Sequence, residues 1–112
     1  MSYIVSKPAS KWVSGSKTIS ASSTQVLFTF SLSKFRSIHF FISGDNITNL
    51  DSRMFRLDVL QESGGLKSIV SNKTGTLNFR VTENISGSNL EVSIVNSETF
   101  DIEVTYERLK IK

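Results

Sequence analysis

Apolar and polar residues alternate with a period of two along most of this chain. The alternation is present in six segments, at 26–32, 38–42, 55–59, 77–81, 90–94 and 100–106, and a shorter apolar stretch lies at 66–70. Successive side chains of a β-strand point to opposite faces, so this pattern predicts half-buried strands. No segment repeats the spacing of an amphipathic helix, and the sequence therefore favours an all-β fold.

The breaks between these segments contain Gly, Asn, Asp and Ser, at 43–46, 63–65, 71–75, 84–89 and 96–97. Gly and Asn tolerate the positive φ angles that tight hairpin turns require. The connections are too short for helical crossovers, so neighbouring strands should be antiparallel. We expect an antiparallel β-sandwich or jelly roll of about seven or eight strands.

Composition supports the same class. The 112 residues include 20 Ser, 9 Thr and 7 Asn but only two Ala, and Ala is the best helix former. Length indicates one domain with a core of its own. The core is predicted to contain the apolar side of each strand: Phe28, Phe30, Phe40, Phe55, Leu57, Phe79, Val92, Ile102 and Val104.

Residues 1–17 lack the alternation and are interrupted by Pro8 and Gly15. We expect an irregular N-terminal arm at 1–17 and a single sandwich domain at 18–112. The arm carries large apolar groups that are costly to leave in water, together with three lysines. Its candidate interface residues are Tyr3, Ile4, Val5, Lys7, Lys11, Trp12, Val13 and Lys17. The alternative is that this segment folds back as an edge strand of its own sandwich.

Catalytic and metal-binding chemistry finds little support in the sequence. Cysteine is absent, and the single histidine, His39, has no motif that supplies a nucleophile and an orienting carboxylate. Asp45, Asn49 and Asp51 could offer oxygen ligands to calcium, but they lack the spacing of an EF-hand. Acidic residues of the last strand alternate as a solvated stripe, at Asp101, Glu103 and Glu107. We therefore expect no enzyme activity, no metal and no cofactor.

The closing segment, 89–106, reads Asn-Leu-Glu-Val-Ser-Ile-Val-Asn-Ser-Glu-Thr-Phe-Asp-Ile-Glu-Val-Thr-Tyr. In this segment and in its Ser/Thr/Asn-rich, cysteine-free style, the chain resembles small β-sandwich or jelly-roll structural proteins of tailed-bacteriophage virions. The resemblance implies a non-enzymatic virion component in capsid decoration, neck, tail or fibre. It implies assembly with other virion proteins and with itself, as a homo-oligomer. No signal peptide or transmembrane segment is expected, so the protein would be made in the host cytoplasm.

Two other functions remain open. A carbohydrate-binding sandwich would use exposed aromatics, for which Trp12, Tyr3 and the 45–51 loop are the candidates. A β-barrel that binds single-stranded nucleic acid would use Lys34, Arg36 and the neighbouring aromatics. Residues 1–44 do carry five basic and no acidic side chains, whereas 45–112 carry eight basic and ten acidic ones. Five charges over 44 residues are also consistent with an ordinary solvated face.

Overall fold

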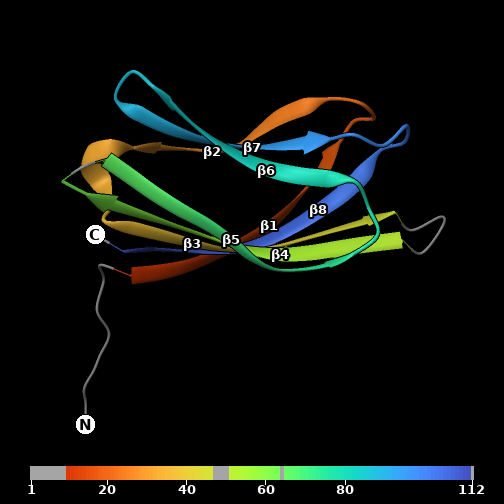
Figure 1. The fold of residues 1–112 in the computed structure, drawn as a ribbon, viewed down its shortest axis with the longest axis horizontal. Coiled ribbons are helices and arrows are strands. Elements are labelled where there is room, and N and C mark those ends of the chain that lie inside the picture. The colour runs from red at the N-terminus through yellow and green to blue at the C-terminus, as the bar shows by residue number, and fades with distance from the viewer. Residues whose placement is uncertain (1–9, 47–50, 64, 112) are drawn as a thin grey trace, which may run out of the picture.

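The computed structural model describes residues 10–46, 51–63 and 65–111. They form eight β-strands and one short 3-10 helix, and the strands pack as two layers (Figure 1). The elements are β1 (Ser10–Ile19), β2 (Thr24–Ser31), η1 (Leu32–Lys34), β3 (Ser37–Asn46), β4 (Asp51–Glu62), β5 (Gly65–Gly75), β6 (Phe79–Ser86), β7 (Asn89–Asn96) and β8 (Ile102–Ile111). In this part of the chain no helix has the length and apolarity needed to cross a membrane.

All strand pairs are antiparallel. The larger sheet has the order β1-β8-β3-β4-β5 and the smaller one the order β2-β7-β6. Strands β3, β4 and β5 follow one another as hairpins, and β8 returns after β6 and β7 to lie beside β3, as in a Greek key. The predicted all-β antiparallel sandwich is confirmed.

The core lies between the two sheets and is rich in phenylalanine. Eight of the nine residues predicted to be buried are buried. The ninth, Phe28, is half-buried, although its ring packs against Phe40 at 5.5 Å and against Tyr106 at 4.8 Å between centroids. A register shift in β2 between Val26 and Phe28 explains the difference. This bulge turns Leu27 into the core and leaves Val26 exposed, a local break in alternation that the sequence pattern does not reveal.

The expected boundary between arm and domain at residue 17 is wrong. Strand β1 pairs with β8 over its whole length, from Ser10 opposite Ile111 to Ile19 opposite Ile102. Residues 10–17 are thus an edge strand of the larger sheet, which is the alternative that the sequence left open. Gly15 permits this pairing, because a Cβ at that position would collide with the Tyr106 hydroxyl. Residues 1–9 lie outside the described part of the chain.

One buried polar side chain, Asn96, ties the two sheets together. Its Nδ2 donates to the carbonyl oxygens of Ile19, Ser20 and Phe100 at 3.0–3.2 Å, and its Oδ1 accepts from the Glu98 N–H at 2.9 Å. Buried amides need such partners, since an unsatisfied one is costly. The side chain thereby holds the end of β1 against the β7–β8 connection.

Candidate functional site

The larger sheet has an outer face, turned away from the smaller sheet, that brings distant sequence segments together. Strand register places Trp12, Leu109, His39 and Asp58 in one row across β1, β8, β3 and β4. The next row contains Ser14, Glu107, Phe41 and Arg56. Side chains of one row stand side by side on the same face. The two rows therefore assemble aromatic, acidic and basic groups within one surface.

A groove of about 700 Å³ crosses this outer face. Four neighbouring strands contribute side chains to it, among them Ser14, Ser16, Phe41, Met54, Arg56, Thr105 and Glu107. Phe41 is 43% exposed and Met54 53%, so the apolar part of the groove is open to solvent. Large apolar groups gathered on an exposed surface are typical of binding sites.

Trp12 borders the groove and stacks on Phe41. Their ring centroids lie 5.9 Å apart with an angle of 27° between the planes, and Trp12 is 53% exposed. The Arg56 guanidinium lies over the Phe41 ring, 5.3 Å from its centroid. A cation over an aromatic face is attracted to it, typically by about 0.5–1 kcal/mol at an exposed site. Together the three side chains form a flat aromatic and cationic surface, here called the platform.

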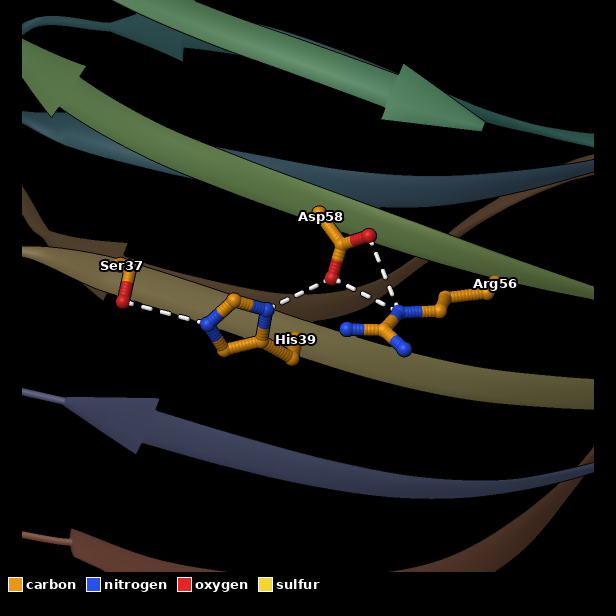
Figure 2. A network of polar contacts seen from close by, with 4 residues as sticks. All are labelled: Ser37, His39, Arg56 and Asp58. Carbon is orange, nitrogen blue, oxygen red and sulfur yellow. Dashed lines mark hydrogen bonds and ion pairs between the residues drawn. The ribbon is translucent and has the colours of Figure 1, made fainter. Parts of the chain in front are cut away.

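A polar network fixes the position of Arg56. Figure 2 shows its four members, Ser37 and His39 on β3 and Arg56 and Asp58 on β4. Arg56 Nε donates to both carboxylate oxygens of Asp58 at 3.0 Å, and His39 Nδ1 lies 2.6 Å from Asp58 Oδ1. Because the carboxylate can only accept, His39 donates from Nδ1. Its Nε2 lies 3.2 Å from the Ser37 hydroxyl.

The network keeps Asp58 ionised. Burial by itself raises the pKa of the Asp58 carboxyl. The hydrogen bonds from His39 and Arg56 and the charges of those two groups lower this pKa by more than burial raises it. The net pKa lies below the ordinary value of 3.8. At neutral pH the carboxylate therefore holds Arg56 over the Phe41 ring.

Ser37, His39 and Asp58 have the connectivity of a serine-hydrolase triad, with a hydroxyl on Nε2 and a carboxylate on Nδ1. Acyl transfer also needs preorganised donors for the oxyanion and a pocket for the substrate. β3 lies between β4 and β8, so its backbone N–H groups serve the sheet ladders. Among the described residues that line the groove, Ser37 and His39 are absent. What the described residues show for this arrangement is that it positions Arg56 through Asp58.

The network predicts a specific loss of stability in acid. A pKa that is lower in the folded than in the unfolded chain stabilises the fold above the unfolded pKa, and this contribution disappears as pH falls through the folded pKa. We expect the free energy of unfolding of the wild type to fall as the pH is lowered from about 5 to below 3.8, and that of Asp58→Asn to fall less over the same range. Urea denaturation at several pH values measures both.

Glu91→Gln is the matched control for this experiment, because the described residues give the Glu91 carboxylate no hydrogen bond or ion pair. Its stability should follow the pH dependence of the wild type. Equal pH dependence of Asp58→Asn and the wild type would contradict the role of the network.

In sequence, the chain matches no protein-family model and no curated protein. In structure, it matches a tailspike protein of Acinetobacter baumannii phage AM24, with a TM-score of 0.58 and 6% identity over 92% of this chain. The chain therefore has the fold of a domain of that tailspike. The match spans 26% of that tailspike, so the chain corresponds to about a quarter of its length.

Two further tailspikes show weaker likeness. The tailspike of Acinetobacter phage vB_ApiP_P1 has a TM-score of 0.45 at 11% identity, covering 100% of this chain and 24% of that one. Tailspike gp49 of A. baumannii bacteriophage Fri1, a capsular polysaccharide depolymerase, has a TM-score of 0.48 at 16% identity, covering 96% and 19%. The match to the AM24 tailspike confirms, at the level of the fold, the resemblance to phage virion proteins that the sequence indicated.

The predicted interface residues lie in different parts of the structure. Trp12 belongs to the platform, whereas Val13 is half-buried in β1. The Lys17 ammonium donates to the Val26 carbonyl at 3.3 Å and so bridges β1 and β2. The remaining candidates, Tyr3, Ile4, Val5, Lys7 and the Lys11 side chain, lie outside the described residues.

Acidic residues considered for calcium or catalysis do not converge. Asn46 pairs with Asp51 and Asp45 with Ser52, so Asp45 and Asp51 face opposite sides of the sheet. Asn49 lies outside the described residues. Asp101 accepts from the Ala21 N–H at 2.9 Å and Glu103 from the Thr18 hydroxyl at 2.7 Å. Within the described ranges no three His, Cys, Asp or Glu side chains gather as a metal site.

The basic and aromatic residues considered for nucleic acid also separate. Lys34 and Arg36 are exposed, but Phe35 and Phe40 are in the core at 6% and 0% exposure. Of the three phenylalanines in this set, only Phe41 faces solvent, on the outer face. The sheets form a sandwich and not the barrel that this interpretation required.

Sequence reasoning missed Met54, Arg56 and Asp58 as functional residues. Their signal was present in the alternation of 55–59, where Arg56 and Asp58 occupy the outward positions. The sequence did not show which residue lies beside Arg56. Arg56 becomes part of the platform because Phe41, 15 residues earlier in the chain, lies opposite it in the sheet.

Proposed function

We propose that this chain is a non-catalytic tail component of a bacteriophage virion that assembles with a second copy through the outer face. The tailspike-like fold supports the tail assignment. The network that positions Arg56 supports a binding role over a catalytic one. The observation that carries the proposal is the exposed platform of Trp12, Phe41 and Arg56.

The chemistry of the outer face is that of a protein interface. Aromatic residues, Met and Arg are enriched at interfaces, and Trp and Arg are frequent hot spots. Beyond the groove, the apolar surface continues with Leu60 at 41% exposure and Ile69 at 61%. Leu60 is in register with Ser37, and Ile69 with Asp58, so both belong to this face.

Charge on the outer face favours a second copy as the occupant. Glu107 and Arg56 flank Phe41 on opposite sides in one row. A two-fold axis that runs parallel to the strands and passes Phe41 would place each Arg56 against the Glu107 of the other copy and bring the two platforms into contact. This is the self-complementary arrangement that a two-fold contact requires. Two copies of a face that carried charges of only one sign could not form such pairs.

Sedimentation equilibrium tests this proposal. We expect the wild type to self-associate, and Phe41→Ala to weaken the association at least about tenfold, as expected for a hot spot. Glu107→Arg and Arg56→Glu should each weaken it through like-charge contacts. An equimolar mixture of these two variants should regain the association, because each supplies the charge that the other lacks.

Glu91→Arg, on the outer side of the smaller sheet, is the matched control, and circular dichroism verifies that each variant is folded. A wild type that stays monomeric at about 100 μM would overturn self-association. A mixture of Glu107→Arg and Arg56→Glu no stronger than either variant alone would overturn the two-fold contact.

Carbohydrate binding is the second candidate function. The observation in its favour is that the platform is bordered by hydroxyl groups from Ser14, Ser16 and Thr105. Sugar rings stack on exposed aromatics, and their hydroxyls hydrogen-bond to such side chains. Retention of the wild type on immobilised host-cell polysaccharide, with loss of retention for Trp12→Ala, would support this function. Retention that survives Trp12→Ala would exclude the platform as a glycan site.

A further inference from the structure

The sandwich has a second concave site, on the opposite side of the larger sheet from the platform. A pocket of about 210 Å³ lies between β4 and β5 of one sheet and the edge strand β6 of the other. It forms where five strands face three, so that β6 leaves part of the inner face uncovered. Its volume equals that of about seven water molecules, enough for one small polar group and its carrier.

Three basic residues line this pocket, Arg53 from β4, Lys73 from β5 and Arg80 from β6. Lys73 and Arg80 are exposed and lie at its rim. No acidic residue lines it among those described. The segments outside the described ranges, 1–9, 47–50, 64 and 112, contain no Asp or Glu either. Ion pairs in the described part of the chain all involve Asp58, on the outer face. None of the three basic residues therefore makes an ion pair with a described residue.

Arg53 is the most informative of the three. Its Nε is buried and has no hydrogen-bond partner among the described residues. Within the described ranges its terminal nitrogen Nη2 makes one long hydrogen bond, of 3.4 Å to the Gly75 carbonyl. A buried donor without an acceptor is costly, so most such groups in native proteins have a partner. An acceptor in the pocket would satisfy the guanidinium.

The floor of the pocket is apolar. Phe55, Phe79 and Val81 are at most 8% exposed and line it together with the cations. Charges interact more strongly beside such a surface than in open water. Guanidinium groups match the planar geometry of a carboxylate in a bidentate pair. An apolar floor beneath a cationic rim therefore suits a carboxylate on an apolar carrier better than a strongly hydrated inorganic ion.

We propose that the pocket formed by Arg53, Lys73 and Arg80 is a binding site for a carboxylate-bearing ligand with an apolar part. The site is separate from the platform, and the proposal does not depend on self-association. The carboxylate would sit among the three cations, with its carrier against Phe55 and Phe79. Binding would relieve the repulsion among the cations and raise the melting temperature.

Benzoate is the probe, and benzamide is its neutral counterpart of nearly the same shape. We expect benzoate to shift the amide NMR signals of Gly75 and Val81 with saturation in the millimolar range, and benzamide to bind at least about tenfold more weakly. Inorganic phosphate is a further arm of the titration, and it should bind more weakly than benzoate because it cannot use the apolar floor.

Single substitutions test which residues bind benzoate. Arg80→Gln and Lys73→Gln should each weaken benzoate binding at least about fivefold, and Arg53→Gln should abolish it. Arg80 is exposed, so its variant tests the site even if Arg53→Gln fails to fold. Lys67→Gln removes the same charge from the outward side of β5 and is the matched control.

Three results would overturn the site: no shift at Gly75 or Val81 up to about 20 mM benzoate, equal binding of benzoate and benzamide, or equal effects of Lys67→Gln and Lys73→Gln. If phosphate bound as tightly as benzoate, the proposal that the ligand has an apolar part would be wrong.

Discussion

Replacing Phe79 with Ala should lower the free energy of unfolding by about 3–5 kcal/mol, as expected for a buried Phe whose cavity cannot collapse. Phe79 is 2% exposed, and its ring lies 5.3 Å from that of Phe55 across the sandwich. It also fills the space above Gly44 in β3, where a Cβ would approach ring atoms to 2.5 and 2.7 Å. Urea denaturation of the two proteins measures the loss.

Phe41→Ala is the matched control, since the same atoms are removed from a side chain that is 43% exposed. Its cost should stay below about 1 kcal/mol for the monomer. A comparable loss in both variants would show that Phe79 contributes no more than a surface aromatic.

Gly44→Ala adds a test of the contact itself. In the wild type the new methyl group collides with the Phe79 ring, so the variant should be destabilised, and in the Phe79→Ala background the collision is gone. The double variant should therefore lose less stability than the sum of the two single ones. Additive losses would mean that Gly44 is required for another reason.

Deletion of residues 1–17 has the other large expected effect. The truncation removes most of β1, leaves the β8 backbone as an unpaired edge and uncovers Tyr106 above Gly15. We expect the melting temperature to fall by more than about 15 °C, or the cooperative transition to vanish, which corresponds to roughly 3 kcal/mol or more in a domain of this size.

Deletion of residues 1–9 alone separates the strand from the segment before it. This shorter truncation keeps β1 intact, so its melting temperature should stay within about 5 °C of the wild-type value. An unchanged melting temperature after deletion of 1–17 would contradict the structural role of β1. Loss of assembly after deletion of 1–9, with stability retained, would support the expected contacts of Tyr3, Ile4 and Val5 outside their own domain.

The sequence by itself determined the fold class and most of the core. Alternation is a local property of each strand, and it correctly separated buried positions such as Phe40 and Leu57 from outward-facing ones such as Phe41 and Arg56. Turn residues marked where the strands end. The pattern failed in β2. There the bulge between Val26 and Phe28 places Leu27 in the core and leaves Val26 exposed, and local composition gives no sign of it.

Only the tertiary structure decided which strands lie side by side. Pairing of β1 with β8 joined residues about 90 positions apart and turned most of the expected arm into an edge strand. The platform needs that pairing and also the register of β8, β3 and β4. The cationic pocket needs the unequal widths of the two sheets. Alternation specifies the face on which a side chain lies, whereas its neighbours on that face depend on contacts between segments far apart in the chain, and local sequence patterns carry no record of those contacts.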